Sequence, residues 1–274
     1  MTSETRRIWL DGAAVEMRFD GSTLHAADGR TIAAADAQHM PPSVPTKIIC
    51  VHLNYQSRVE ELKTETPLAP NYFLKATTAL NSHKGAVVRP ANCNYLNYEG
   101  EVAIVIGRTA RSVRIADAFD YVEGFTLAND LAFHDFRHAD RGSMLRVKSA
   151  DTLAPVGPGL VRGWHPEDQL LVTRVNGEIV QQARLSEMVF GMDYLIADLS
   201  RTMTLLPGDM IFSGTPANSR PVNPGDVVTV ECDGLGMLEN HIVSSPQHIS
   251  DEAGWMPEAS EMALGVAFGE QLRE

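Results

Sequence analysis

Two glutamates at the start of an apolar run are the residues of this sequence whose spacing best suits a metal ion. Glu99 and Glu101 lie in the segment NYEGE at 97–101, and the apolar run VAIVIG at 102–107 follows directly. In a β-strand, residues i and i+2 point to the same face, so the two carboxylates would converge on one point. Carboxylate oxygens suit hard cations such as Mg²⁺, Mn²⁺ or Ca²⁺. The spacing predicts a divalent-metal site; the alternative is a pair of solvated glutamates on a half-buried strand.

Further polar residues are suited to complete such a site. Asp130 follows an apolar run and is a natural third carboxylate, although an Asp before a helix is also a common N-cap. Lys148 and Lys75 each have apolar neighbours, so either could be a partly buried cation for a substrate carboxylate or oxyanion. The alternative for both is a lysine that lies along the surface with its charge in water. In the segment SGTP at 213–216, backbone amides and the Thr215 hydroxyl could line a pocket; a plain turn is the alternative.

The composition is that of an acidic globular protein. The chain has 274 residues, 44% of them hydrophobic, and a net charge of −12, which argues against nucleic acid and anionic membranes as partners. Its three cysteines are widely spaced without a CxxC motif, so neither a disulfide framework nor a thiolate zinc site is expected. We expect a cytoplasmic protein, since no signal peptide and no apolar run of about 20 residues is visible.

The elements that must position these residues are mostly strands. Apolar or alternating runs predict strands at 47–53, 101–107, 122–129, 169–175, 209–213 and 226–232. Asn176-Gly177 predicts a hairpin turn. Helices are expected over 56–63, 116–119, 131–140 and 192–204. Residues 1–44 form a small β-rich segment with short runs between Asp-Gly turns, and a Pro-rich linker leads into a catalytic domain over 45–274.

Taken together and in this order, the polar segments resemble the motif series of the fumarylacetoacetate hydrolase family. The series consists of YFLK at 72–75, YEGE at 98–101, Asn129-Asp130, Lys148 with Asp151-Thr152, and SGTPA at 213–217. The resemblance extends from about Lys47 to Ile242. Because five segments agree in order, it is far more specific than any single motif.

The resemblance implies a mainly β fold with some α, a roll or flattened barrel of mixed sheets that assembles as a homodimer. It also implies one Mg²⁺ or Mn²⁺ per subunit and a small 2-oxo acid or β-diketo acid substrate that chelates the ion. By match, the metal ligands would be Glu99, Glu101 and Asp130. Lys148 would contact the substrate, Thr215 would line the site of its carboxylate, and Lys75 would support the site.

The chain departs from the family in the lid segment. Family hydrolases and some decarboxylases carry a histidine and a glutamate shortly after an Asn-Tyr, but here Arg58 stands at the histidine position and Glu61 at the glutamate position. Arginine cannot act as a general base near neutral pH. Arg58 could instead clamp a second substrate carboxylate through its bidentate fork, which would make the substrate a dicarboxylate. His52 is a substitute base only if the lid folds differently, and a satisfied strand-end histidine is the better interpretation.

A cluster of basic residues after Asp130 also suits an anionic substrate. On a helix, His134, Arg137, His138 and Arg141 would share one face, and a solvated face or a subunit contact is the alternative. Arg141 is closer in sequence to Lys148 than Arg137 is, which makes it the preferred substrate-binding arginine.

Three functions are consistent with these residues. The leading hypothesis is a metal-dependent decarboxylase or isomerase of unsaturated 2-oxo dicarboxylates from aromatic catabolism, the homoprotocatechuate-type branch of the family. Its metal would stabilise an enolate, and Glu61 or Glu60 would be the proton shuttle, with a pKa raised if the lid closes over it. The alternative is a C–C hydrolase of the fumarylacetoacetate or acylpyruvate type. A third possibility is a metal-binding family member without turnover.

Overall fold

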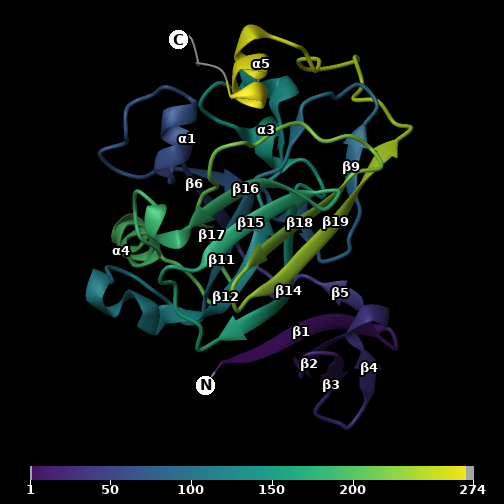
Figure 1. The fold of residues 1–274 in the computed structure, drawn as a ribbon, viewed down its shortest axis with the longest axis vertical. Coiled ribbons are helices and arrows are strands. Elements are labelled where there is room, and N and C mark those ends of the chain that lie inside the picture. Colours follow the sequence, from purple (N-terminus) through teal and green to yellow (C-terminus); the bar gives the residue numbers. More distant parts are fainter. Residues whose placement is uncertain (1, 270–274) are drawn as a thin grey trace.

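Two large β-sheets pack face to face in this computed structural model, which describes residues 2–269 (Figure 1). Over those residues, a 12-stranded mixed sheet runs in the order β4-β3-β2-β1-β14-β12-β11-β17-β6-β7, with β5 paired to β1 and β8 paired to β14. A five-stranded sheet runs β16-β15-β18-β19-β9, and β10 pairs with β13. The mainly β class is confirmed. Both larger sheets end in edge strands, so they are open and not closed barrels.

The bounds of the strands are as follows. The first half of the chain contains β1 (Ser3–Leu10), β2 (Ala13–Phe19), β3 (Thr23–His25), β4 (Thr31–Ala33), β5 (Gln38–Met40), β6 (Ile48–His52), β7 (Asn71–Lys75), β8 (Leu80–Ser82), β9 (Val87–Pro90), β10 (Leu96–Asn97), β11 (Gly100–Ile106), β12 (Val122–Asn129) and β13 (Ala132–Phe133). The second half contains β14 (Ala154–Arg162), β15 (Leu170–Val175), β16 (Glu178–Arg184), β17 (Met210–Phe212), β18 (Val227–Cys232) and β19 (Gly236–Ser245).

The helices are short and lie outside the sheets. They are α1 (Gln56–Glu61), α2 (Arg137–Asp140), α3 (Leu145–Ser149), α4 (Met192–Thr202) and α5 (Glu261–Phe268), with 3-10 turns η1 (Ala34–Asp36), η2 (Thr77–Ala79), η3 (Ile115–Tyr121), η4 (His134–Phe136) and η5 (Leu185–Glu187). None of the described helices is long and apolar enough to cross a membrane.

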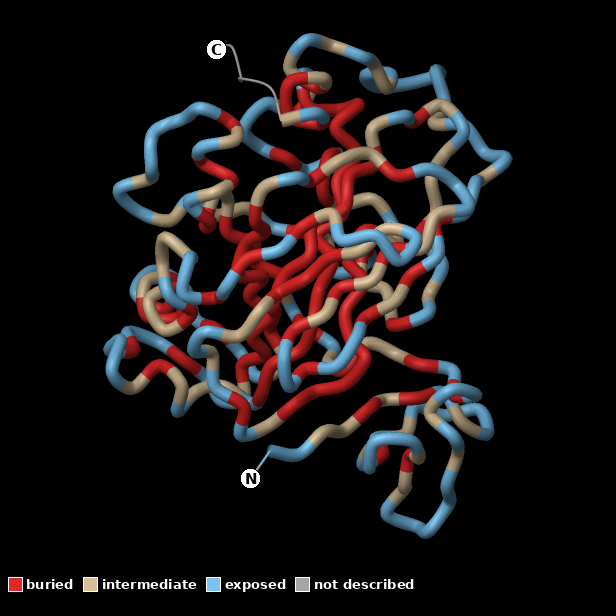
Figure 2. Tube along the Cα trace, in the orientation of Figure 1, coloured by how far each residue is buried: buried red, intermediate tan, exposed pale blue. Residues whose placement is uncertain are grey.

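The strand that carries Glu101 is buried on both faces. Alternate residues of β11 enter two different clusters: Val102 and Ile104 pack in the core between the sheets, and Ala103 and Val105 pack on the opposite face of the larger sheet. A strand covered on both sides needs a continuous apolar run and not an alternating one, which is the pattern of 102–106. Figure 2 shows this buried centre in red. The site glutamates are therefore fixed to the most deeply packed part of the fold.

The N-terminal strands β1–β5 extend the larger sheet. β1 pairs antiparallel with β14 through Ser3–Arg162, Glu4–Val161 and Thr5–Leu160. These strands have a small apolar cluster of their own, which includes Ile8, Met17 and Leu24. The division of the chain at residue 44 stays a prediction.

Most predicted elements are present, and the helix predicted over 131–140 is wrong. That segment contains strand β13, the 3-10 turn η4 and only one α-helical turn, α2. The reason is tertiary: the Asp135 carboxylate accepts hydrogen bonds from the backbone N–H groups of Asn94 (2.8 Å) and Tyr95 (2.9 Å), and β13 pairs with β10. These contacts outweigh helical periodicity. The segment predicted as a helix at 116–119 is the 3-10 turn η3.

The predicted hairpin at Asn176-Gly177 is confirmed. It joins β15 and β16, and both turn residues have positive φ, 52° and 86°, which is the conformation of a type I′ turn.

Candidate metal centre and active site

Three carboxylates meet where β11 begins and β12 ends. These strands are antiparallel with Gly100 opposite Asn129, so their neighbours Glu99, Glu101 and Asp130 lie at the same edge. Ligand oxygens of these three residues all lie within 4.8 Å of one another. The local backbone is locked, because the Asp130 N–H donates to the Glu99 carbonyl (2.8 Å) and the Glu99 N–H donates to the Asn129 side chain (2.8 Å).

Two buried lysines bind these carboxylates. Lys148, on α3, donates from Nζ to Glu99 Oε2 (2.6 Å), Asp130 Oδ2 (2.9 Å) and the Asp130 carbonyl (2.8 Å). Lys75, at the end of β7, donates to Asp130 Oδ1 (2.5 Å) and the Leu131 carbonyl (2.9 Å). Burial alone lowers the pKa of Lys148, but the charges of Asp130 and Glu99 outweigh it and raise that pKa. Lys148 is therefore an ammonium ion in this structure.

Glu101 is the carboxylate of this group that lacks a cation. Its Oε2 accepts a hydrogen bond from the Gly214 N–H (2.7 Å), and no ion pair to it is present among the described residues. Burial, and then the charges of Asp130 and Glu99, raise its pKa well above the usual value. By contrast, Lys148 and Lys75 hold the pKa of Asp130 below its usual value despite burial. Three converging oxygen ligands, one of them short of positive charge, fit a hard divalent cation.

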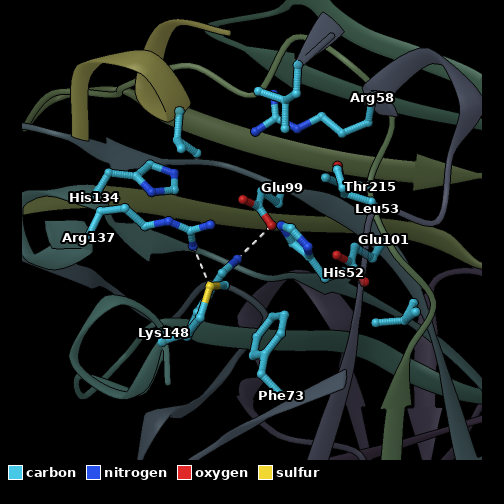
Figure 3. A pocket seen from close by; sticks show the side chains of 14 residues that line it. His52, Leu53, Arg58, Phe73, Glu99, Glu101, His134, Arg137, Lys148 and Thr215 are labelled. Carbon is cyan, nitrogen blue, oxygen red and sulfur yellow. Dashed lines mark hydrogen bonds and ion pairs between the residues drawn. The ribbon is translucent and has the colours of Figure 1, made fainter. Parts of the chain in front are cut away.

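A cavity opens beside this carboxylate group (Figure 3). Its walls include Glu99, Glu101, Lys148, Thr215 and Arg58. Thr215 lies in the loop after β17, and its hydroxyl accepts a hydrogen bond from Gln181 Nε2 (3.0 Å). These wall residues, all predicted for the site from the sequence, come from four separate parts of the chain.

Gln181 is a site-forming residue that the sequence did not reveal. It is buried on β16, and its Nε2 also donates to the carbonyls of Pro216 (2.9 Å) and Ala217 (3.1 Å). Its Oε1 accepts from the Gly100 N–H (3.2 Å). One amide therefore ties the Thr215 loop to the strand that carries Glu101. A glutamine in an exposed-looking hairpin strand gives no sequence signal for such a role.

Glu61 does not line the cavity and is held in ion pairs. Its carboxylate accepts from Arg58 Nη1 (2.5 Å), from Arg220 (2.7 Å) and from the Asn218 N–H (3.1 Å). Burial raises its pKa, but the charges of Arg58 and Arg220 outweigh burial, so the pKa lies below its usual value. The prediction that lid closure raises the pKa of Glu61 is therefore wrong.

The basic cluster after Asp130 is divided between the cavity and the surface. Arg137 and His134 are buried and line the cavity, whereas Arg141 is exposed and is not part of its wall. Arg141 has φ 49°, so the helix has already ended there. His138 is exposed and contacts Glu258 (2.8 Å). The four residues do not share one helical face, because the helix on which that expectation rested is broken.

His52 lies at the end of β6 and lines the cavity, and no hydrogen bond between its ring and a protein group is present among the described residues. Burial, followed by the charges of Arg137 and Lys148, lowers its pKa to about 3. The imidazole is therefore neutral at physiological pH.

The C-terminal helix α5 supplies another part of the wall. Val266 lines the cavity, and Asn97 Nδ2 donates to the Ala267 carbonyl (3.0 Å). Ser260 caps the start of this helix, because its hydroxyl accepts a hydrogen bond from the Ala263 N–H (3.2 Å). Figure 1 shows α5 above α3, on the same side of the molecule as α1.

The segment that contains the candidate site matches a known protein family. Residues 47–243 match the family described as fumarylacetoacetate (FAA) hydrolase C-terminal. The chain is 44% identical over 200 residues to the 4-hydroxyphenylacetate degradation bifunctional isomerase/decarboxylase of Escherichia coli; the match covers 72% of this chain and 47% of that protein. The chain thus spans about half the length of that relative.

Two solved structures have the same fold. The 5-carboxymethyl-2-hydroxymuconate delta-isomerase of Mycobacterium smegmatis superposes with a TM-score of 0.82 at 33% identity, covering 89% of this chain and 100% of that one. The fumarylpyruvate hydrolase of Pseudomonas aeruginosa, in complex with Mn²⁺ and pyruvate, has a TM-score of 0.69 at 25% identity, covering 73% of this chain and 91% of that one. With the carboxylate group, the lysines and the matched segment in agreement, the chain belongs to the fumarylacetoacetate hydrolase family.

Proposed function

We propose that this chain is a divalent-metal-dependent enzyme that isomerises or decarboxylates unsaturated 2-oxo dicarboxylic acids in aromatic-compound catabolism. The reaction types are those of 2-hydroxyhepta-2,4-diene-1,7-dioate isomerase and 5-carboxymethyl-2-oxohex-3-ene-1,7-dioate decarboxylase. The observation that carries this proposal is the convergence of Glu99, Glu101 and Asp130 beside a cavity that Lys148 also lines. The isomerase and decarboxylase names of the relatives support the choice of reaction.

The metal ligands in this proposal are Glu99, Glu101 and Asp130, and the ion is Mg²⁺ or Mn²⁺. The Mn²⁺ of the Pseudomonas aeruginosa relative supports a divalent ion. When bound, such an ion supplies Lewis-acid stabilisation of the negative charge that develops on the substrate oxygens. Lys75 keeps Asp130 ionised and oriented through its hydrogen bond of 2.5 Å.

The remaining residues act directly on the substrate. The Lys148 ammonium provides positive charge beside the oxygen that becomes an enolate when a proton or CO₂ leaves. The Thr215 hydroxyl, oriented by Gln181, hydrogen bonds the 2-oxo acid carboxylate. Arg58, for which the sequence suggests contact with a second carboxylate, lines the cavity on the lid side and is already paired with Glu61. Because Arg58 replaces the lid histidine, the chain lacks the residue with which family hydrolases activate water.

The test is product analysis on a panel of 2-oxo mono- and dicarboxylates and acylpyruvates, with Mg²⁺, Mn²⁺ or EDTA. Metal-dependent CO₂ release or double-bond migration, without cleavage into two acids, is the expected result. Cleavage into two acids would assign the chain to the second candidate, a C–C hydrolase of the fumarylacetoacetate or acylpyruvate type, which the fumarylpyruvate hydrolase relative supports. Bound metal with no turnover of any substrate would favour a non-catalytic family member.

A homodimer and a cytoplasmic location also belong to the proposal, and both rest on the family resemblance and the composition. Light scattering coupled to size-exclusion chromatography would measure the oligomeric state. We propose no nucleic-acid or membrane partner.

A further inference from the structure

Arg137 is a buried arginine without a carboxylate partner among residues 2–269. Its side chain faces the cavity, and its one hydrogen bond joins Nη1 to the sulfur of Met144. The acid on its own helix, Asp140, is occupied by the Arg146 guanidinium (2.8 Å) and by the Val147 N–H (3.0 Å). A buried charge is costly unless an opposite charge compensates it. The guanidinium is therefore short of an anion.

His134, three residues earlier, is a second buried group without a polar partner. It is 1% exposed, and both ring nitrogens lack a hydrogen bond among the described residues. Burial, and then the charges of Arg137 and Lys148, lower its pKa well below the usual value. The neutral ring has one N–H donor and one acceptor nitrogen. A buried polar atom without a hydrogen bond destabilises the fold, so this part of the wall is suited to face a polar ligand.

The two groups lie on one side of the candidate metal ligands. Figure 3 shows His134 and Arg137 together on the left of Glu99, and Glu101 and His52 on its right. The cavity therefore has carboxylates at one end and an unpaired cation at the other.

Arg58, unlike Arg137, already has a carboxylate partner. Its guanidinium already holds Glu61 at 2.5 Å, and Glu61 also binds Arg220. A carboxylate that reached Arg58 would have to share it with Glu61. Arg137 has no such competitor among the described residues, so it is the stronger attractor for a second negative charge.

We propose that Arg137 and His134 form a second anion site, which binds the carboxylate at the far end of a substrate whose 2-oxo acid end lies at Glu99, Glu101 and Asp130. The guanidinium offers a planar fork that matches a carboxylate, and the imidazole N–H adds a third donor. This inference rests on the proposed function, since it assumes a 2-oxo acid as substrate. It assigns the selection of dicarboxylates to Arg137 and not to the exposed Arg141.

The experiment compares Arg137→Gln with Arg141→Gln, two equal changes of which only one alters the cavity. Binding to the Mn²⁺-loaded protein is measured by calorimetry for 2-oxo dicarboxylates from 2-oxoglutarate to 2-oxopimelate. The matched 2-oxo monocarboxylates, 2-oxobutyrate and 2-oxohexanoate, are measured in parallel. We expect Arg137→Gln to weaken the best dicarboxylate about 10- to 100-fold, the value of a charge-assisted hydrogen bond, with monocarboxylate binding unchanged. Arg141→Gln should change neither.

A second variant keeps the proposal testable if Arg137→Gln folds poorly. His134→Gln keeps a neutral donor and should weaken dicarboxylates by less than Arg137→Gln does, again without an effect on monocarboxylates. Equal weakening of both substrate classes, an effect of Arg141→Gln as large as that of Arg137→Gln, or a wild-type protein that binds no 2-oxo dicarboxylate would overturn the proposal. Because binding is measured without turnover, an inactive protein that still binds dicarboxylates through Arg137 would refute the proposed reaction and leave this site in place.

Discussion

The Lys148 ammonium lies 2.6 Å from Glu99 Oε2 and 2.9 Å from Asp130 Oδ2, so a single cation bridges two of the three candidate metal ligands. A divalent ion at this position would share those carboxylates with Lys148. The same residue lines the cavity, within reach of a substrate. Lys148 thus couples the carboxylates to the substrate space.

Replacing Lys148 with methionine separates these roles. Lys148→Met removes the charge but keeps a long apolar stem, so the carboxylates lose a competing cation. We expect Mn²⁺ to bind at least as tightly as in the wild type, whereas kcat falls about 10²- to 10³-fold because a preorganised charge is lost. Calorimetry with Mn²⁺ and steady-state kinetics measure the two effects. Loss of metal binding together with activity would show that Lys148 acts on the ligands alone.

Glu101→Gln should stabilise the metal-free protein and abolish its response to metal. The raised pKa of Glu101 means that its charged form is disfavoured in the fold, so a neutral isostere removes repulsion from Asp130 and Glu99. We expect the free energy of unfolding in EDTA to rise by on the order of 1 kcal/mol. The increase in Tm that Mn²⁺ gives the wild type should disappear. A variant that is still stabilised by Mn²⁺ would exclude Glu101 as a ligand.

Glu61→Gln tests the proton-shuttle role expected from the sequence. Since ion pairs lower the pKa of Glu61, we expect stereospecific proton exchange at C3 of a 2-oxo acid to persist in the variant. The KM for dicarboxylates should change, because Arg58 and Arg220 lose their shared partner. Exchange is followed by NMR in deuterated buffer. Glu60→Gln is the matched control, an exposed neighbour on the same helix, and loss of exchange in Glu61→Gln alone would restore the shuttle role.

Asp209 anchors the segment that leads into β6, and Asp209→Asn should destabilise the fold. Its carboxylate accepts from the Thr46 hydroxyl (2.6 Å), the backbone N–H groups of Lys47 (3.1 Å) and Leu206 (2.7 Å), and the Lys47 ammonium. We expect a loss of about 2–4 kcal/mol at pH 7, measured by urea unfolding. Asp117→Asn, which removes an exposed ion pair with Arg114, should change the free energy of unfolding far less than Asp209→Asn does.

The contacts of Asp209 also predict how the stability of the fold depends on pH. Burial raises the pKa of Asp209, but the hydrogen bonds from Lys47 and Thr46 outweigh it, so the folded pKa lies below the reference value of 3.8. An ionised carboxylate with such a lowered pKa stabilises the fold fully when the pH is above its pKa in the unfolded chain. This stabilisation is lost as the pH falls through its pKa in the folded protein. The difference between wild type and Asp209→Asn should therefore be constant from pH 5 to pH 8 and narrow below about pH 3.8. A difference that is unchanged at pH 3 would contradict the assignment.

The carboxylate group could be predicted from the sequence because its members lie at strand ends. Glu99 and Glu101 precede an apolar run, and Asp130 follows the next strand along the chain, so pairing of two neighbouring strands brings them together. Lys148 and Thr215 were found through the motif series. To predict these residues it is enough to know the local residue pattern and the order of the strands, and both can be read from a sequence.

That Arg137 lines the cavity and Arg141 does not could not be predicted from the sequence. Helical periodicity treats them as neighbours on one face, but Asp135 turns its carboxylate to the 94–95 backbone and the helix ends at Asp140. The long-range partner of Asp135 leaves no local signal. The sequence also carries no signal for the positions of Gln181 and Val266, since each reaches the site from an element far away in the sequence.

The position of α5 has a practical consequence for purification. Val266 lines the cavity, while β1 begins at the opposite end of the molecule (Figure 1). An affinity tag fused after residue 274 would be attached a few residues beyond a helix that forms part of the cavity wall. A tag fused before β1 would be remote from it. Specific activity compared between the two tagged forms, before and after tag removal, would show how far the cavity tolerates an appended peptide.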